Sequence, residues 1–421
     1  MIGGGGREHA LARSLMRSRR NPEVLCAPGN AGIAKDGVEC LELEVEDIDG
    51  IVRAATGREV DLVVVGPEAP LVGGLVDALE EAGVRAFGPS AAAARIEGSK
   101  RYAKQLMREL GIPTAAYTML RSRREALDQI PCASYPAVLK ADSLAAGKGV
   151  IVCADEPAAR AAVDEFFTER RFGRTEVVLE EFLDGEELSL LALCDGERAV
   201  PMAPAQDYKR IFDGDEGPNT GGMGSYSPVP GISGDHVHAL ARALHQPVVD
   251  AMRKRGCPYH GVLYAGLMMT ADGPKVLEYN CRFGDPETQA VLPRLRSDLL
   301  DLLESCTRPG GLADREMEWS SEWAVTVVLA SRGYPESSSC GDEIRGLRSI
   351  DSLEVEVLHA ATAEEDGRFV TAGGRVLNVT GIGATPGEAR DRAYAAADRI
   401  QFDGKQMRRD IAARAVDHVE V

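Results

Sequence analysis

Apolar residues alternate between short continuous runs and helical spacing over the first hundred positions. Residues 60–65 form an almost continuous β-branched run, which is typical of a buried parallel strand. Helical spacing of apolar residues then covers residues 71–82, and residues 84–87 predict another short strand. This strand–helix–strand order predicts an open parallel α/β sheet over residues 1–97.

The middle of the chain predicts one well-marked helix and a series of strands. The helix begins at Ser99 and ends at Gly111, which is followed by a proline. Strand patterns and hairpins with Asp-Gly turns follow at residues 136–141, 150–153, 177–182, 188–202 and 262–280. The segment 214–230 has five glycines and no periodicity, so we expect a structureless loop. Loops of that length in a compact chain are usually functional or disordered, and the well-patterned flanks favour function.

The last hundred residues predict a small α+β unit. Strand patterns cover residues 324–330 and 375–380, and Thr385 with Glu388 forms a capping box at the start of a final helix. The predicted organisation is therefore three units, at residues 1–97, 98–320 and 321–421. The fold class is mixed α/β and α+β.

Composition and charge restrict the class of protein. The 421 residues are 44% hydrophobic and 27% charged, which is typical of a globular protein. No apolar run approaches the length of a membrane-spanning helix, and the N-terminus does not resemble a signal peptide, so we expect a cytoplasmic protein. The net charge of −18 disfavours nucleic-acid and membrane partners, although a local basic pocket still attracts a small anion. The nine cysteines include no C-x-x-C pair, which favours reduced thiols over disulfides or a zinc site.

An acid and an amide in the strand ending at Asn280 are candidate metal ligands. Side chains alternate along a strand, so Glu278 and Asn280 share one face, and we expect Leu277 and Tyr279 to point into the core. Carboxylate and amide oxygens suit Mg²⁺, which keeps waters and substrate phosphates as its other ligands. The alternative is a solvated strand face.

Two neighbouring features are candidates for binding phosphate. Lys140 lies near the end of an apolar strand, where a charge is costly unless it is paired, and a phosphate oxygen is a natural partner. The alternative is a lysine whose charged end reaches solvent. The following loop ends in Gly147, Lys148 and Gly149, which offer backbone donors and a point charge. This loop is not a Walker A sequence, and the alternative is a plain hairpin tip.

Two further segments carry groups that suit a nucleotide or an anion. The acidic strand end at residues 180–187 offers exposed backbone for an adenine edge and Glu187 for ribose hydroxyls, or else it is an acidic strand–loop junction. The N-terminal glycines followed by Arg7 predict an anion site at a helix N-terminus. The spacing of these glycines does not match the dinucleotide fingerprint, so an NAD site is disfavoured.

In chain order, these pieces resemble the glycinamide ribonucleotide synthetase (phosphoribosylamine–glycine ligase) family of ATP-grasp ligases in purine biosynthesis. The resemblance rests on GGGGREHA (3–10), APGNAG (27–32), VGPEAPLV (65–72), EGSK (97–100), LKADSLAAGKGV (139–150), EEFLDGEE (180–187), GPNTGGMGSYSP (217–228), YAGLM (264–268), LEYNCRFGDPETQ (277–289) and GGRVLNVT (373–380). It implies an N-terminal Rossmann-like substrate domain (the pre-ATP-grasp domain), an ATP-grasp domain with a mobile subdomain at about residues 114–185, and a small C-terminal domain.

The resemblance also implies a reaction and a set of site residues. ATP, glycine and 5-phosphoribosylamine would give ADP, phosphate and glycinamide ribonucleotide through a glycyl phosphate, with Mg²⁺ or Mn²⁺ as cofactor. We expect a monomer whose partners are these small molecules. The ATP-binding residues implied are Lys100, Lys140, Gly147, Lys148, Gly149, Glu180, Glu181, Phe182, Leu183 and Glu187, and the metal ligands are Glu278 and Asn280. The substrate-binding residues implied are Gly5, Arg7, Asn30, Glu68, Asn219, Thr220, Gly221 and Gly222, and Arg282, Lys148 and Asp207 are assigned to catalysis.

The sequence departs from the family pattern at its start. Only Met1 and Ile2 precede the first glycine, where the family usually has several more apolar residues, so we expect either an upstream start or a nearly absent first strand, and we favour the former. Tyr208 stands where a histidine is usual, and we expect it to modulate activity. Two alternatives remain: an ATP-grasp ligase for another amino acid or amine, and a nucleotide-binding protein without catalysis.

Overall fold

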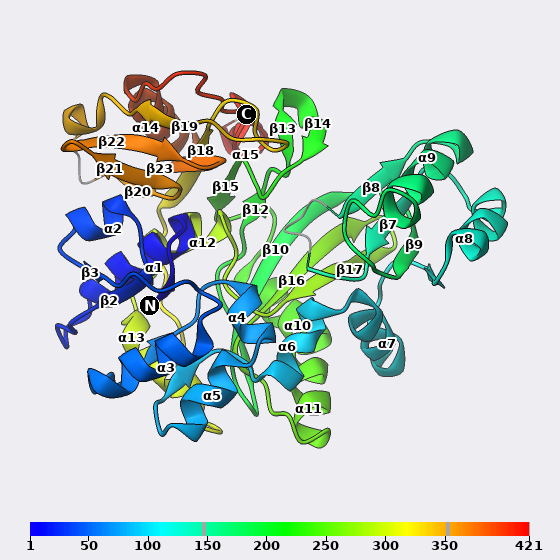
Figure 1. Ribbon diagram of the computed structural model, residues 1–421, viewed down its shortest axis with the longest axis horizontal. Coiled ribbons are helices and arrows are strands. Elements are labelled where there is room, and N and C mark those ends of the chain that lie inside the picture. The colour runs from blue at the N-terminus through cyan, green and yellow to red at the C-terminus, as the bar shows by residue number, and fades with distance from the viewer. Residues whose placement is uncertain (145–148, 351–353, 421) are drawn as a thin grey trace.

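The computed structural model describes residues 1–144, 149–350 and 354–420. The N-terminal unit (blue) lies against the C-terminal unit (orange to red), while a small sheet with two helices extends to the opposite side of the molecule (Figure 1). Two of the expected phosphate-binding residues, Gly147 and Lys148, lie outside the described residues.

Five short strands and six helices make up the N-terminal unit. The strands are β1 (Ile2–Gly3), β2 (Leu25–Pro28), β3 (Glu39–Cys40), β4 (Val63–Val64) and β5 (Ala86–Phe87). The helices are α1 (Gly6–Met16), α2 (Ala31–Lys35), α3 (Ile48–Gly57), α4 (Glu68–Val72), α5 (Leu75–Glu81) and α6 (Ala91–Gly98). All strand pairs are parallel, and a bridge between Ile2 and Val65 joins the two groups of strands. The predicted open parallel α/β sheet is therefore confirmed.

Three predicted elements of this unit differ in extent. The strands expected over residues 60–65 and 84–87 are only β4 and β5. The helix expected over residues 71–82 is two helices, α4 and α5, because Gly74 takes a left-handed conformation with φ of 90° between them. At the chain start, Ile2 pairs with Ala27 on one side and with Val65 on the other. The two-residue strand β1 therefore lies between β2 and the segment that contains β4.

The first sheet of the middle unit is antiparallel and follows a capped helix. Helix α7 (Lys100–Leu110) begins where predicted, because the Ser99 side chain accepts the amide of Tyr102, and it ends at left-handed Gly111. The sheet has the order β6 (Tyr117–Leu120), β9 (Val177–Glu181), β7 (Ala137–Ala141) and β8 (Val150–Cys153). Helices α8 (Arg123–Gln129) and α9 (Glu156–Phe167) pack against it around a core that includes Leu139 and Phe166.

The middle unit has a second antiparallel sheet. Its order is β11 (Ala199–Pro201), β10 (Glu186–Asp195), β16 (His260–Thr270) and β17 (Gly273–Asn280). The helices around it are α10 (Gly234–Leu244), α11 (Gln246–Lys254), α12 (Glu287–Val291) and α13 (Leu299–Cys306). A bridge between Thr114 and Val276 connects β17 to the segment that leads into the first sheet.

A β-bulge in β17 changes which side chains face the core. Gly266 pairs with Glu278, but the next residue, Leu267, pairs with Val276, so Leu277 is an extra residue on this strand. Val276 is fully buried, whereas Leu277 is half-buried and lines a cleft. The expectation that Leu277 points into the core is therefore wrong, while that for Tyr279 is confirmed, since its side chain is 2% exposed.

The C-terminal unit has a five-stranded sheet that recruits two strands from the middle of the chain. Its order is β12 (Gln206–Asp207), β15 (Gly224–Ser227), β18 (Trp323–Ala330), β23 (Arg375–Gly383) and β20 (Val355–His359). A second sheet contains β19 (Cys340–Glu343), β22 (Arg368–Ala372) and β21 (Thr362–Glu365), and the helices are α14 (Pro386–Arg399) and α15 (Ala413–Glu420).

The segment 214–230 is not structureless. It contributes β14 (Glu216–Asn219), which pairs with β13 (Arg210–Phe212), and the buried strand β15. Gly224 serves close packing, because a Cβ at this position would lie 2.6 Å from the carbonyl oxygen of Thr326 on the neighbouring strand. Backbone pairing across the sheet therefore supplies the order that the local pattern lacks.

Candidate functional site

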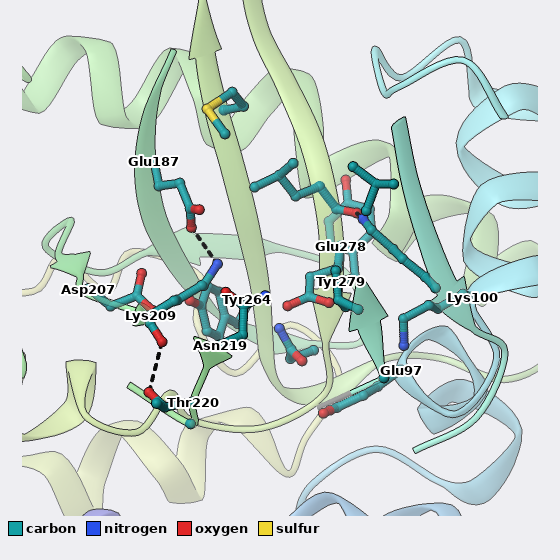
Figure 2. A pocket seen from close by; sticks show the side chains of 18 of the residues that line it. Glu97, Lys100, Glu187, Asp207, Lys209, Asn219, Thr220, Tyr264, Glu278 and Tyr279 are labelled. Carbon is teal, nitrogen blue, oxygen red and sulfur yellow. Dashed lines mark hydrogen bonds and ion pairs between the residues drawn. The ribbon is translucent and has the colours of Figure 1, made fainter. Parts of the chain in front are cut away.

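One cleft of about 690 Å³ is lined by residues of the N-terminal, middle and C-terminal units. Figure 2 shows the part of it formed mainly by the middle unit. The cleft brings together most of the residues predicted from the sequence. Those that line it are Arg7, Glu68, Lys100, Lys140, Gly149, Glu180, Glu181, Phe182, Leu183, Glu187, Asp207, Asn219, Thr220, Gly221, Glu278, Asn280 and Arg282. Gly5, Asn30 and Gly222 do not line it.

The candidate metal ligands share the cleft wall formed by β17. Burial would raise the pKa of Glu278, but Lys209, Lys100 and further cations lower it, and the pKa lies below its ordinary value. The carboxylate is therefore ionised at neutral pH. Asn280 is 8% exposed, and its side-chain oxygen lies 3.4 Å from an Arg282 nitrogen.

A two-ligand oxygen site suits a hard divalent cation. Within the part of the chain that the structure describes, no group of three or more His, Cys, Asp or Glu side chains is placed to hold a metal. Mg²⁺ is commonly held by one or two protein oxygens together with waters and phosphates. The ionised carboxylate of Glu278 and the amide oxygen of Asn280 fit that requirement.

The residues that the sequence assigns to an adenine edge divide between buried and open positions. The Glu180 carboxylate is buried and lies 2.8 Å from Lys140 Nζ, so Lys140 has a protein partner at the strand end. The Glu181 side chain accepts the amide of Ala116 at 3.0 Å. Phe182 is 43% exposed and Leu183 is 7% exposed, so this segment presents apolar surface and backbone at the cleft edge.

Lys209 is a site residue that the sequence analysis missed. Its ammonium forms an ion pair with Glu187, as Figure 2 shows. Burial would lower the pKa of Lys209, but Glu187, Asp207 and Glu278 raise it well above its ordinary value. A lysine two positions after Asp207 in a polar segment gives no periodic signal, and only the folded arrangement shows that it faces three carboxylates.

Asp207 is the most strongly perturbed acid in the cleft. Burial raises its pKa, Lys209 lowers it, and the carboxylates of Glu287 and Glu187 raise it again, to a value of about 8. A buried acid with this pKa exchanges a proton near neutral pH.

Arg282 is clamped between two acids at the boundary with the N-terminal unit. Its Nε lies 3.2 Å from Glu68 and its Nη2 lies 3.1 Å from Glu97. Glu97, which the sequence analysis did not assign, also accepts the amide of Cys281 at 2.7 Å. Burial raises the pKa of Glu97 despite the opposing effect of Arg282. The two acids hold the guanidinium beside Asn280 at the end of β17.

Glu287 is a second unassigned acid, at the start of α12. It is 3% exposed and accepts hydrogen bonds from the hydroxyls of Tyr264 at 2.5 Å and Ser189 at 3.1 Å. Two hydroxyl donors therefore fix this carboxylate at the cleft wall.

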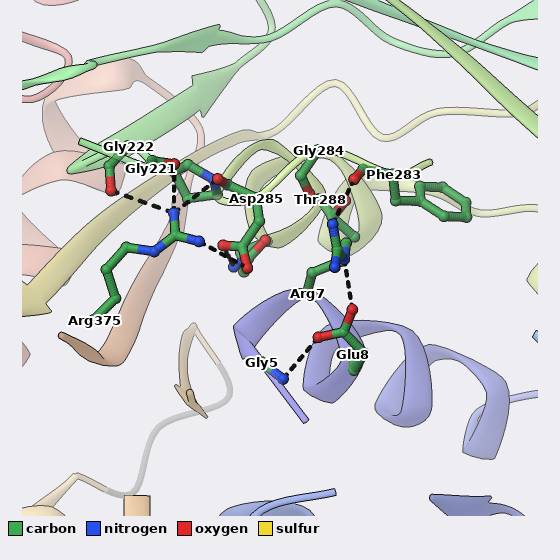
Figure 3. A network of polar contacts seen from close by, with 12 residues as sticks. Gly5, Arg7, Glu8, Gly221, Gly222, Phe283, Gly284, Asp285, Thr288 and Arg375 are labelled. Carbon is green, nitrogen blue, oxygen red and sulfur yellow. Dashed lines mark hydrogen bonds and ion pairs between the residues drawn. The ribbon is translucent and has the colours of Figure 1, made fainter. Parts of the chain in front are cut away.

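A network of polar contacts joins three units of the chain beside the cleft (Figure 3). Arg7 donates to the carbonyl of Phe283 at 3.1 Å and pairs with Glu8 at 2.6 Å. From β23, Arg375 donates to the carbonyls of Gly221 at 2.5 Å and Asp285 at 2.8 Å. A C-terminal arginine thus holds the glycine loop against the segment that precedes α12.

Asn30 makes its hydrogen bonds outside the cleft. Its side-chain oxygen accepts the amides of Gly32 and Ile33, and its amide nitrogen donates to the carbonyls of Gly4 at 2.8 Å and His359 at 2.9 Å. All of these contacts are within the protein, so Asn30 fixes the N-terminal glycine loop against the C-terminal unit.

Comparison with known proteins gives the family. Models of the phosphoribosylglycinamide synthetase N domain, ATP-grasp (A) domain and C domain match residues 1–97, 98–288 and 324–414. The chain belongs to the phosphoribosylglycinamide synthetase family. The ATP-grasp fold and the three-part organisation expected from the resemblance agree with this assignment. Within the described residues, no helix is long and apolar enough to span a bilayer.

Relatives and solved structures of this family match the whole chain. The phosphoribosylamine–glycine ligase of Streptomyces coelicolor is 51% identical over 422 residues, which cover 99% of this chain and 98% of that protein. The trifunctional purine biosynthetic protein adenosine-3 of Gallus gallus is 47% identical, and the match covers 99% of this chain and 42% of that protein. The crystal structure of phosphoribosylamine–glycine ligase from Thermotoga maritima superposes with a TM-score of 0.82 at 36% identity, covering 98% of this chain and 99% of that one.

Proposed function

We propose that the chain joins glycine to 5-phosphoribosylamine with cleavage of ATP, giving glycinamide ribonucleotide, ADP and phosphate. The observation that carries the proposal is the ionised Glu278 beside Asn280 in a cleft where Lys100, Lys140, Lys209 and Arg282 converge. The relatives named phosphoribosylamine–glycine ligase support the choice of reactants.

The chemistry explains why these groups are needed together. A carboxylate oxygen is a poor leaving group, so glycine must first be phosphorylated by ATP to a glycyl phosphate, which the sugar amine then attacks at the carbonyl carbon. Carboxylate and triphosphate repel each other until cations neutralise them. In this cleft Lys100, Lys140 and Lys209 neutralise phosphate charge, and Arg282, fixed by Glu68 and Glu97, stabilises the oxyanion that develops.

We propose Mg²⁺, with Mn²⁺ as an alternative, as the cation held by Glu278 and Asn280. When bound, it would supply Lewis-acid neutralisation of the phosphate oxygens. The nucleotide would lie between the cations of α7 and β7 and the edge formed by residues 181–183, with Glu187 near the ribose. Binding there would require Glu187 to share or exchange its present partner, Lys209.

The remaining site assignments divide between the acceptor and the segments that close over it. We propose that Arg7, Glu68, Asn219, Thr220 and Gly221 contact 5-phosphoribosylamine, while Gly5, Asn30 and Gly222 shape the loops behind them. Asp207, whose pKa is about 8, is suited to accept the proton that the sugar amine loses on attack. Lys148 and Gly147, which lie outside the described residues, are proposed to contact phosphate together with Gly149.

We further propose the organisation of the working protein. Residues 1–97, 98–320 and 321–421 act as substrate, ATP-grasp and C-terminal domains, and residues 114–185 move to close over the nucleotide. Closure would exclude water, which otherwise hydrolyses the acyl phosphate. We propose a monomer that works in the cytoplasm on small molecules, without nucleic-acid or membrane partners.

A panel of amino acids tests the proposed reaction. The chain is supplied with MgATP, ribose 5-phosphate, ammonia and one amino acid at a time, and ADP formation is measured. We expect glycine to give turnover well above alanine and serine. Equal turnover with alanine would favour a ligase for another amino acid, and ATP binding without phosphate release would favour a binding protein; either result contradicts the proposal.

A further inference from the structure

A buried cluster of two lysines and one glutamate, Lys104, Lys140 and Glu180, lines the cleft. Lys104 Nζ lies 3.0 Å from Glu180 Oε1, and Lys140 Nζ lies 2.8 Å from Glu180 Oε2. The side chains of Lys104 and Glu180 are 3% and 2% exposed, and that of Lys140 is 8% exposed. One carboxylate therefore forms ion pairs with two ammonium groups, so the cluster carries a net positive charge.

The two lysines differ in what else they contact. Lys140 Nζ lies 3.5 Å from the carbonyl oxygen of Leu277, a residue of the cleft wall. Lys104 Nζ donates to the Thr114 hydroxyl at 2.7 Å, and that hydroxyl donates to the carbonyl of Val276 at 2.6 Å. Lys104 is thus anchored between α7 and β17, whereas Lys140 has weaker contacts besides Glu180.

Binding of a phosphate by Lys140 changes the charge balance of the cluster. Lys140 must weaken its contact with Glu180 if its ammonium is to reach a phosphate oxygen in the cleft. A buried carboxylate left without a cation is strongly disfavoured. With Lys104 in place, Glu180 keeps one buried counter-charge after Lys140 has moved.

We propose that Lys104 is a positioning residue for ATP, which neutralises the buried Glu180 carboxylate and so allows Lys140 to leave it for a phosphate oxygen. This inference rests on the proposed function, because it requires a nucleotide phosphate in the cleft. The role is assigned to the contact of Lys104 with Glu180, and Lys104 also lines the cleft. It acts by weakening the electrostatic attraction between Glu180 and Lys140.

Two ligands separate this role from a general structural one. Binding of MgATP and of adenosine to the full chain is measured by calorimetry for the wild type and for Lys104→Met. We expect the ATP Kd to rise about 10- to 100-fold, the range for one charge-assisted contact, because Lys140 is retained by Glu180. Adenosine lacks phosphates, so its Kd should change less than about 2-fold. Lys254→Met, which removes an exposed lysine on α11, is the matched control and should leave both constants unchanged.

A second background tests the route through Glu180. In a Glu180→Gln chain, the neutral amide no longer retains Lys140, so adding Lys104→Met should change the ATP Kd by less than about 3-fold. Lys104→Gln keeps a donor for Thr114 without the charge, and it is measured in parallel so that misfolding of the methionine variant does not decide the result. We expect it to weaken ATP binding in the same direction.

Three results would overturn the inference. They are an unchanged ATP Kd in Lys104→Met, an equal loss of ATP and adenosine binding, and an equal loss from Lys104→Met in the wild-type and Glu180→Gln backgrounds. A wild-type chain that binds ATP but forms no product with glycine contradicts the proposed function alone. A wild-type chain that binds no ATP contradicts both.

Discussion

Replacing Glu278 by glutamine removes one charge from the cleft and changes little else. The side chain keeps its size, and an amide oxygen remains beside Asn280. Lys209, Lys100, Lys140 and Arg282 act on Glu278 strongly enough to keep its pKa below the ordinary value despite burial. The substitution therefore leaves these cations without their shared carboxylate and takes one anionic ligand from the proposed metal.

The size of the effect follows from the role of the contact. Loss of one preorganised electrostatic contact to a developing charge costs about 10²–10³ in kcat, or about 2.7–4 kcal/mol. We expect Glu278→Gln to fall in this range. The Mg²⁺ concentration for half-maximal rate should also rise, because the neutral amide is a weaker ligand.

Coupled ADP release with saturating glycine, ribose 5-phosphate and ammonia measures this prediction. Glu186→Gln is the matched control, since Glu186 is an exposed acid at the start of strand β10 of the same sheet and does not line the cleft. Its rate and Mg²⁺ dependence should equal those of the wild type. A Glu278→Gln rate within about 3-fold of the wild type, far below the loss expected for such a contact, would refute the metal-ligand role.

Three further predictions concern stability. The pKa of Asp207 is raised by burial from 3.8 to about 8, so the folded state binds a proton that the unfolded state releases, and stability falls as pH rises from about 4 to 8. Asp207→Asn should therefore raise the melting temperature more at pH 7.5 than at pH 4.5. An equal rise at both pH values would contradict this prediction. Burial and neighbouring cations lower the pKa of His359 from 6.5 to about 3, so stability is lost as pH falls below about 6.5. His359→Gln should reduce the loss of unfolding free energy between pH 7 and 5, measured by denaturant titration. An equal loss in the variant and the wild type would contradict this prediction. Val276→Ala should lower the free energy of unfolding by about 2 kcal/mol. Leu277→Ala should lower it less and should instead raise the KM for ATP. A larger loss of unfolding free energy in Leu277→Ala than in Val276→Ala would show that the bulge is misplaced.

Local patterns were sufficient for elements whose ends carry their own signals. Ser99 and Gly111 mark the limits of α7 because one caps the first turn and the other takes the left-handed conformation that ends it. The strand-like run at residues 177–182 and the hairpin pattern with an Asp-Gly turn at residues 262–280 likewise predicted the strands that carry Glu180 and Glu278. In these cases the local preference and the folded arrangement agree.

Other features depend on partners that are distant in the sequence. The bulge that turns Leu277 into the cleft arises from pairing with β16, and strand alternation alone assigns the opposite face. The strand β15 exists because it pairs with β18, nearly a hundred residues later. Glu97, Lys209 and Glu287 become site residues only because three separate segments meet around Arg282 and Asp207, so no local spacing marks them.

Oxygen transfer from glycine to phosphate is the most direct test of the central claim that the chain activates a carboxylate by phosphorylation. The chain is incubated with MgATP, ribose 5-phosphate, ammonia and glycine carrying ¹⁸O in both carboxylate positions, and the phosphate released is analysed by mass spectrometry. Attack of the carboxylate on the γ-phosphate, followed by attack of the amine on the carbonyl carbon, places one ¹⁸O in each phosphate and leaves the other in the amide product. Phosphate free of ¹⁸O, formed together with product, would contradict the account.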